Sequence, residues 1–192
     1  MTPVRAILLC GGTGSRFGGG KLLASAPGSE LAVGVRAARS VIEGAGHALA
    51  VLRPGDEPLR RALDAAGCEV LVTPDATRGI GASLCAAVKA SPDAAGWLVA
   101  LGDMPRIRPA THRAVIDALA RGARLAAAAD ATGRRGHPVG FSQELFADLA
   151  ALDGDEGARS VIERHRAWLE LVRVDDPGIY FDIDTPGDLA AP

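Results

Sequence analysis

The fold of this chain is decided by residues 6–24, AILLCGGTGSRFGGGKLLA, where an aliphatic run passes into a loop with six glycines, one arginine and one lysine. A short run of Ile, Leu and Val bounded by glycines predicts a strand over 4–10 that is buried on both faces of a sheet. Glycines lack a Cβ atom, so the loop after this strand lets the backbone approach a ligand closely. A buried strand that ends in such a loop favours an α/β fold with a ligand site at the end of the strand.

Four further apolar runs predict strands at 48–53, 69–73, 96–103 and 124–130. Between them, apolar residues recur at helical spacing, with Ser29 as the expected N-cap of the first helix and Pro109 at the start of a later one. This alternation predicts an α/β three-layer sandwich with a mostly parallel, Rossmann-like sheet. After residue 130 the alternation loosens, which predicts a partly antiparallel C-terminal extension. The chain has no linker or repeat, so we expect a single domain over 1–192.

Composition narrows the function classes. Hydrophobic residues make up 48% of the chain, charged residues 23%, and the net charge is −2, which argues against a nucleic-acid partner. The cysteines Cys10, Cys68 and Cys85 are far apart and odd in number, which predicts reduced thiols. No apolar run approaches the ~18 residues of a membrane span, and no signal-peptide pattern opens the sequence. A cytoplasmic protein with no membrane partner is expected.

Two well-known nucleotide motifs fail in the glycine loop. The dinucleotide pattern G-x-G-x-x-G is broken by Phe17, and the strand at 48–53 ends in Arg53 where an acidic residue is expected. The P-loop pattern is broken by Ser15 at its first glycine and by Leu22 at the Ser or Thr that holds Mg²⁺. A dinucleotide oxidoreductase is therefore disfavoured.

The same loop still suits phosphate groups. Successive backbone amides without Cβ obstruction form an anion-binding nest. Arg16 adds a guanidinium that can bind phosphate with two hydrogen bonds, and Lys21, one of only two lysines in the chain, adds a compact charge. The loop is predicted to bind phosphates.

A candidate metal ligand lies at the end of the strand predicted at 96–103. The segment VALGDMP (99–105) places Asp103 at the end of that strand, and Pro105 biases Met104 away from helical conformation. Mg²⁺ binds hard oxygen ligands and needs only one or two protein carboxylates beside substrate phosphates. Asp103 is therefore a candidate Mg²⁺ ligand.

A second acidic segment lies near the C-terminus, YFDIDTPGDL (180–189). Strand-like alternation directs Asp182 and Asp184 to the same side of an extended segment. Thr185 and Asp188 are spaced as an acidic capping box, which gives Asp188 a structural role. Either Asp182 or Asp184 can be the second carboxylate.

These motifs together resemble one family. The loop from Leu9 to Leu23, G-D-M-P at 102–105 and D-I-D-T-P at 182–186 resemble the molybdopterin nucleotidyltransferases, which have a nucleotide-sugar-transferase-like fold. The resemblance covers nearly the whole chain. It implies a Mg²⁺-dependent enzyme that transfers a nucleoside monophosphate from a nucleoside triphosphate to a phosphorylated pterin-type acceptor and releases pyrophosphate. A molybdoenzyme maturation partner is a further implied partner.

The resemblance also implies residue roles. Arg16, Lys21 and Asp103 take the catalytic positions. Asp103 and Asp182 match the metal positions, with Asp184 as the alternate to Asp182. The positions implied to bind the nucleotide or the acceptor are Leu9, Cys10, Gly11, Gly12, Thr13, Gly14, Ser15, Arg16, Lys21, Gly79, Ser83 and His137.

The base and the acceptor stay less defined. The segments RGIGASL (78–84), GRRGHPVGF (133–141) and GDEGAR (154–159) look like the branch that uses CTP. Gly11 instead matches the GTP-using branch and is expected to enlarge the space beside the base. Ser83 either contacts a pyrimidine edge or caps a helix.

His137, between Gly136 and Pro138, is expected in an exposed turn, in contact with the acceptor phosphate. A guanylyltransferase, or transfer to another phosphorylated acceptor such as a sugar phosphate or phospholactate, is the nearest alternative. A non-catalytic cofactor-delivery protein is a more distant one, because binding alone needs no pair of metal carboxylates.

Overall fold

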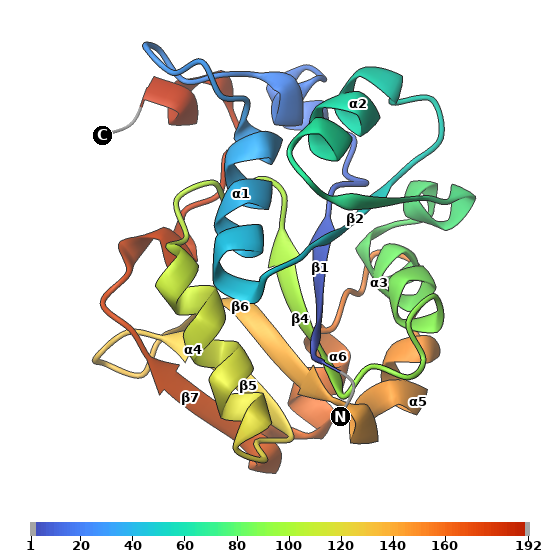
Figure 1. Cartoon of the computed structure of the whole chain (residues 1–192), viewed down its shortest axis with the longest axis vertical. Coiled ribbons are helices and arrows are strands. Elements are labelled where there is room, and N and C mark those ends of the chain that lie inside the picture. The colour runs from blue at the N-terminus through green and yellow to red at the C-terminus, as the bar shows by residue number, and fades with distance from the viewer. Residues whose placement is uncertain (1–2, 191–192) are drawn as a thin grey trace.

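The computed structural model describes residues 3–190 and contains a seven-stranded sheet with helices on both faces (Figure 1). The strand order is β3-β2-β1-β4-β6-β5-β7. Every neighbouring pair is parallel except the two pairs that β6 makes with β4 and β5. The strands are β1 (Arg5–Leu9), β2 (Leu49–Leu52), β3 (Glu69–Val72), β4 (Gly96–Leu101), β5 (Leu125–Ala129), β6 (Arg135–Ser142) and β7 (Leu169–Arg173). The predicted α/β sandwich, mostly parallel with a late antiparallel element, is confirmed.

Two hydrophobic cores explain why the strands are apolar on both sides. In β1, Ile7 belongs to one core and Leu8 to the other, as expected for alternating side chains in a sheet covered on both faces. Figure 1 shows α1 and α4 side by side on one face, and α3, α5 and α6 grouped on the other. The helices are α1 (Val33–Ala45), α2 (Glu57–Ala65), α3 (Ile80–Lys89), α4 (Pro109–Ala120), α5 (Phe146–Ala150) and α6 (Arg159–Arg164).

The structure agrees with some of the predicted helix and strand boundaries and differs from others. Pro109 stands at the first helical position of α4, as predicted. The alanine-rich strand β5 is fully buried, so its assignment is confirmed. Ser29 is not the N-cap of α1, because that helix begins four residues later and the Ser29 hydroxyl instead accepts a hydrogen bond from the Leu31 N–H.

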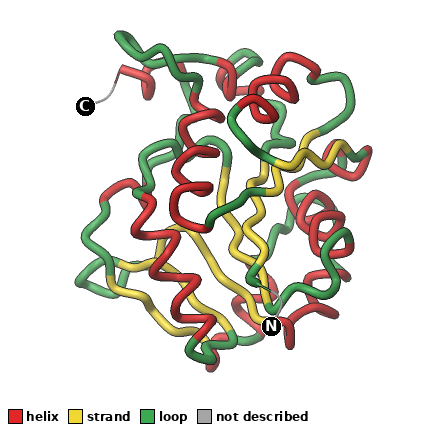
Figure 2. Tube along the Cα trace, viewed as in Figure 1, coloured by secondary structure: helices red, strands yellow, loops and turns green. Residues whose placement is uncertain are grey.

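The parallel pairing of β1 and β4 fixes the position of the candidate site. Leu9 and Leu101 are partners at the carboxyl ends of the two strands. The loops that follow them therefore leave the same end of the sheet, where loop segments gather (Figure 2). None of the described helices is both long and apolar enough to cross a membrane. Cys10, Cys68 and Cys85 are buried free thiols.

Candidate active site

The loops after β1 and β4 are packed directly against each other. The Gly102 N–H donates a hydrogen bond of 2.9 Å to the Leu9 carbonyl. A Cβ atom at Gly102 would lie 2.7 Å from the Cys10 Sγ, so only glycine fits without a shift. Cys10 therefore lies beneath the site as a packing residue, and Asp103 emerges beside the glycine loop.

The glycine loop folds into two short turns that orient its cations differently. Gly14, Gly18, Gly19 and Gly20 all have φ between +59° and +95°, a region that side-chain-bearing residues rarely adopt. The loop thereby forms 3₁₀ turns at Ser15–Phe17 and Lys21–Leu23. As a result, the Arg16 side chain in the first turn reaches solvent, whereas the Lys21 side chain in the second turn points inward.

The inward lysine connects the two loops. Lys21 Nζ donates a hydrogen bond of 2.7 Å to Asp103 Oδ2 and lies 3.6 Å from Asp184 Oδ1. Its side chain is only 12% exposed. Arg16, whose side chain is 78% exposed, donates a 2.6 Å hydrogen bond to Asp184 Oδ2. The two loop cations and two carboxylates thus form one connected ion-pair cluster at the end of the sheet.

The C-terminal acidic segment is anchored on Asp103 by the backbone. Ile183 is buried, and its N–H donates a 2.9 Å hydrogen bond to the Asp103 carbonyl. This contact brings Asp182 and Asp184, on either side of Ile183, to the end of β4. The segment is not part of a strand, but its side chains alternate as expected, because Ile183 is buried while Asp182 is exposed and Asp184 pairs with Lys21. The sequence places Asp103 and Asp182 79 positions apart, and the fold brings them together as predicted.

Asp182 differs from Asp184 in its charge environment. Burial, and the negative charges of Asp184 and Asp103, raise the pKa of the Asp182 carboxyl above its ordinary value. A divalent cation would relieve this repulsion, and carboxylate oxygens are suitable ligands for it. No set of three or more closely grouped acidic, His or Cys ligands occurs among the described residues. The residues present fit a metal held by two carboxylates and completed by substrate phosphates.

Asp188 has the structural role predicted for it. Its Oδ2 atom accepts hydrogen bonds from the backbone N–H groups of Asp184 and Thr185 and from the Thr185 hydroxyl. It thereby closes the turn before a 3₁₀ helix, Pro186–Ala190.

A cavity of about 380 Å³ opens beside the cluster, and we call it the glycine-loop cavity. One wall is the loop after β1, the opposite wall is the approach to α3, and Asp103 stands at its edge. Asp155 and Arg78, which sequence reasoning did not single out as site residues, also line it. The lining residues are Leu9, Gly11, Gly12, Thr13, Ala76, Thr77, Arg78, Gly79, Ile80, Ser83, Leu101, Asp103 and Asp155. Gly14 and Ser15 are outside this lining, in the turn that carries Arg16.

The position that a Cβ atom of Gly11 would occupy is filled by protein, although the Gly11 backbone lines the cavity. A Cβ atom there would lie 2.9 Å from the Ala76 Cβ and 3.2 Å from the Ser83 Oγ. The expectation that Gly11 enlarges the room beside a base is therefore wrong. Ser83 lies within the first turn of α3, where its hydroxyl donates a 2.8 Å hydrogen bond to the Gly79 carbonyl. Gly79 occupies the N-cap position, so Ser83 is not the cap.

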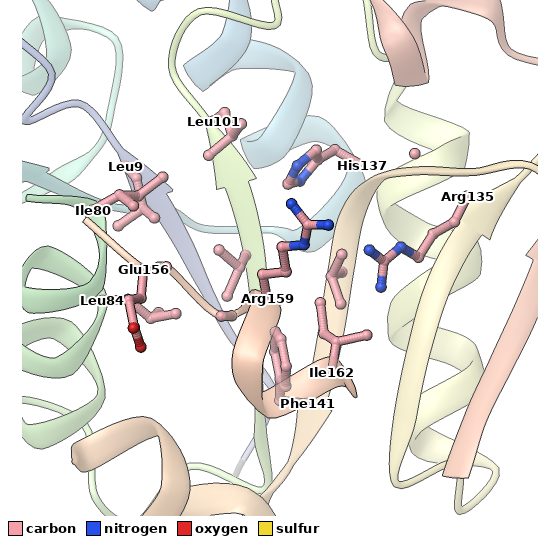
Figure 3. Close-up of a pocket in the computed structure, with 15 residues that line it drawn as sticks. Leu9, Ile80, Leu84, Leu101, Arg135, His137, Phe141, Glu156, Arg159 and Ile162 are labelled. Atoms are coloured by element: carbon pink, nitrogen blue, oxygen red, sulfur yellow. The ribbon is translucent and has the colours of Figure 1, made fainter. Parts of the chain in front are cut away.

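A second cavity, of about 340 Å³, adjoins the first and shares Leu9, Ile80 and Leu101 with it. We call it the aliphatic cavity, because most of its walls are aliphatic (Figure 3). Its remaining lining residues are Leu84, Val99, Arg135, Gly136, His137, Val139, Phe141, Glu156, Gly157, Ala158, Arg159 and Ile162.

His137 lies in this aliphatic cavity, but not in an exposed turn. It is part of β6 and half-buried, because β6 inserts between β4 and β5. Burial and the nearby Arg135 lower the pKa of the imidazole, while Asp103 acts in the opposite direction. Its Nδ1 atom is enclosed and has no hydrogen-bond partner within residues 3–190.

The fold and the site together define a nucleotidyltransferase. Residues 6–168 match the MobA-like NTP transferase domain, and the chain belongs to this family. No curated protein is significantly similar to it in sequence.

Solved structures of similar proteins have the same fold. Rv0371c from Mycobacterium tuberculosis H37Rv is 30% identical, with a TM-score of 0.83 over 97% of this chain and 95% of that one. The same protein in complex with manganese is 28% identical, with a TM-score of 0.78 over the same shares. A nucleotidyl transferase from a species of Methanothermobacter is 22% identical, with a TM-score of 0.78 over 98% of this chain and 94% of that one, and shares the fold.

Proposed function

We propose that this nucleotidyltransferase transfers CMP from CTP to the terminal phosphate of molybdopterin or the molybdenum cofactor and releases pyrophosphate. One observation carries the proposal: Lys21 of the glycine loop is hydrogen-bonded to Asp103 while the 182–184 segment is anchored on the same aspartate. Phosphate-binding cations and candidate metal carboxylates thus meet at the edge of a cavity large enough for part of a nucleotide.

The glycine loop would hold the triphosphate. Gly11, Gly12 and Thr13 line the cavity with backbone, which allows close approach of phosphate oxygens. Lys21 and Arg16 would exchange their carboxylate partners for phosphate oxygens, since both cations lie on this rim. The base would then face the opposite wall, which includes Gly79 and Ser83.

Asp103 and Asp182 would hold the metal, proposed here as Mg²⁺. A divalent cation at this position neutralises charge on phosphate groups. A similar protein has been solved in complex with manganese, which supports a divalent-metal site in a related fold. Asp184, already paired with Arg16 and Lys21, is assigned to orienting these cations and is the alternate ligand.

The chemistry is a displacement at the α-phosphorus. An oxygen of the acceptor phosphate forms a bond to this atom, and the bond from the α-phosphorus to the bridging oxygen breaks. The electron pair of that bond leaves with pyrophosphate, so atoms and charge balance without a redox partner. Lys21, Arg16 and the loop amides stabilise the charge that develops on the transferred and leaving groups. The protein needs to supply no covalent nucleophile.

CTP as donor and molybdopterin as acceptor rest on the sequence segments 78–84, 133–141 and 154–159, which line or flank the two cavities. GTP as donor and another phosphorylated acceptor are the alternatives. We further propose that the chain acts as a single domain in the reducing cytoplasm, which suits three buried free thiols.

Pyrophosphate release with each of the four nucleoside triphosphates, with and without molybdopterin and with Mg²⁺, tests this proposal. The expected result is release that requires the acceptor and is fastest with CTP. Release with no triphosphate and acceptor combination would contradict transferase activity. Acceptor-dependent release with GTP alone would instead show that the donor is GTP and not CTP.

A lysine pair supplies a matched control. Lys21→Met keeps the aliphatic stem and removes one preorganised charge, which is expected to lower turnover roughly 10²–10³-fold. Lys89→Met removes the other lysine, which is exposed on α3 and lines neither cavity, and should leave turnover unchanged. Equal turnover of the two variants would remove the glycine loop from the mechanism.

A further inference from the structure

The segment that carries Asp182 and Asp184 lies outside the strands of the sheet. Residues 176–184, which we call the acidic strap, follow β7 and contain a 3₁₀ turn, Pro177–Tyr180, but belong to no strand. In Figure 1 the chain after β7 passes beside the loop between β4 and α4. A backbone segment outside a sheet keeps a fixed position only through its individual contacts. The position of the two carboxylates therefore depends on what the acidic strap touches.

The acidic strap lies along the β4–α4 loop, residues 102–108, which begins with the Asp103 turn. Near the start of the strap, Gly178 packs so closely on this loop that a Cβ atom there would lie 2.3 Å from the Arg106 carbonyl oxygen. Near its end, the Ile183 N–H donates a 2.9 Å hydrogen bond to the Asp103 carbonyl. The two segments therefore run past each other in opposite directions, in contact at both ends.

A side-chain contact joins the same two segments between these points. The guanidinium carbon of Arg106 lies 3.7 Å from the centroid of the Phe181 ring, which is a cation–π contact. Both residues are half-buried, so the contact is partly shielded from water. Arg134 lies over Tyr180 in the same way, at 4.1 Å, but it comes from the loop before β6, which carries none of the proposed metal ligands. Arg106, in contrast, shares its loop with Asp103.

We infer that Arg106 is a positioning residue for a divalent cation, because its contact with Phe181 sets the spacing of the Asp103 and Asp182 carboxylates. The inference rests on the proposed function only in assigning the metal to these two carboxylates. Asp103 is three residues before Arg106, and Asp182 directly follows Phe181, so few backbone bonds separate the contact from either ligand. Ligands that are held in place before the cation arrives bind it more tightly, since less ordering remains to be paid for on binding.

Hydrogen exchange at the Ile183 N–H tests the positioning without any metal. This amide is bonded to the Asp103 carbonyl, so its exchange rate reports how often the acidic strap leaves the loop. Arg106→Gln is expected to speed the exchange roughly 3–10-fold relative to the amides of β1, as loss of a partly buried cation–π contact predicts. Arg124→Gln removes a contact of the same kind, with Trp168 outside the strap, and should leave the exchange unchanged. Unchanged exchange in Arg106→Gln would overturn the inference.

A titration with Mn²⁺, followed by the electron paramagnetic resonance signal of the free ion, measures the consequence for the metal. Arg106→Gln is expected to weaken Mn²⁺ binding roughly 3–10-fold. Arg106→Lys should weaken it less, because it keeps a cation that can lie over the ring. Arg124→Gln should bind normally.

A double-variant cycle isolates the contact between the two side chains from any other role of Arg106. Phe181→Leu keeps an apolar side chain but removes the aromatic face, and should weaken Mn²⁺ binding by a factor similar to that of Arg106→Gln. The double variant should be little worse than either single, because both remove the same contact. Fully additive losses would overturn the inference.

Two aspartate variants separate this inference from the proposed function. If Asp103→Asn and Asp182→Asn weaken Mn²⁺ binding but Arg106→Gln does not, the metal site stands and the positioning role is overturned. If neither aspartate variant changes Mn²⁺ binding, the assigned metal site fails and the role of Arg106 toward the metal fails with it. If Mn²⁺ binding needs both aspartates and Arg106 while no nucleoside triphosphate releases pyrophosphate, the proposed transfer fails and the positioning role stands.

Discussion

The two adjoining cavities share three aliphatic walls but compensate their cations in opposite ways. On the glycine-loop side, Lys21 and Arg16 are paired with Asp103 and Asp184. On the aliphatic side, Arg135 and Arg159 make no ion pair with residues 3–190. A paired cation must leave a carboxylate before it binds a phosphate, whereas an uncompensated one is ready for its anion. The glycine-loop side would therefore bind an anion by exchange of partners, and the aliphatic side would bind one directly.

This exchange of partners gives Asp103 two roles, one without nucleotide and one with it. Without nucleotide, Asp103 neutralises Lys21 and keeps it inside the site. In the proposed mechanism a phosphate would take over Lys21, and Asp103 would then be free to bind a metal together with Asp182. Changes to these carboxylates should therefore affect turnover far more than changes to the cavity walls.

The largest effect is expected from Asp103→Asn. The substitution removes the charge that pairs with Lys21 and one proposed metal ligand, so turnover should fall by roughly 10²–10³-fold or more. Affinity for nucleotide should fall less, because the glycine loop still contacts the triphosphate. Steady-state pyrophosphate release and nucleotide titration measure the two effects, with Asp93→Asn, an exposed residue outside both cavities, as control.

The same assay decides between the two neighbouring carboxylates. If Asp103 and Asp182 share one metal, the double variant should be little worse than either single, because residues that act as a unit lose function non-additively. Asp184→Asn should be milder. Full activity in Asp182→Asn with loss in Asp184→Asn would move the ligand by two residues, and full activity in Asp103→Asn would refute the mechanism.

The sequence predicts the site residues that lie directly after a strand, because short apolar runs are enough to locate the strands. Buried strands ending in glycine or acidic loops predicted the parallel half of the sheet, and parallel pairing of β1 and β4 brings the loops that carry Lys21 and Asp103 to the same end of the sheet. The placement of Asp182 and Asp184 beside this pair was not accessible in this way. It depends on the hydrogen bond from Ile183 to Asp103, which joins segments 80 positions apart in the sequence.

The residues of the aliphatic cavity were harder to predict for a related reason. Residues 135–137 look like a polar loop in sequence, but β6 runs antiparallel between β4 and β5 and carries them into the sheet. Likewise, the packing of Gly11 depends on Ala76 from a distant loop. No pattern within a short stretch of the sequence predicts either contact.

A smaller effect is expected from Gly11→Ala. The added methyl would meet Ala76 and Ser83, and overpacking of this kind costs about 1–3 kcal/mol. Thermal unfolding should show a lower Tm, and CTP and GTP binding should weaken by the same factor. Ala76→Gly in the same chain should restore part of both losses, since it removes the 2.9 Å contact. A change in the CTP to GTP ratio, with normal Tm, would instead return Gly11 to base selection.

The smallest expected effect is a change in the thermal stability of Asp182 variants. It distinguishes repulsion of Asp182 by Asp103 and Asp184 from attraction by Lys21. Burial and two neighbouring carboxylates raise the pKa of Asp182 above its ordinary value of 3.8, so its ionised form is less favourable in the folded chain than in the unfolded one. At a pH below that value both states are protonated and the cost vanishes; as the pH rises through the folded pKa, the cost appears, and it is complete at neutral pH.

Asp182→Asn should therefore raise Tm at pH 7 by about 1–2 °C, because the carboxyl is only partly buried and solvent screens the interaction, and should leave Tm unchanged at pH 3. Added Mg²⁺ should raise the Tm of the natural chain at pH 7 and have little effect on the variant, since the cation relieves the same repulsion. Unfolding curves at the two pH values, with and without Mg²⁺, measure both differences, and Asp93→Asn serves again as control. A lower Tm for Asp182→Asn at pH 7 would mean that this carboxylate is stabilised by Lys21 more than it is repelled by its neighbours, which would remove the electrostatic basis for assigning it to the metal.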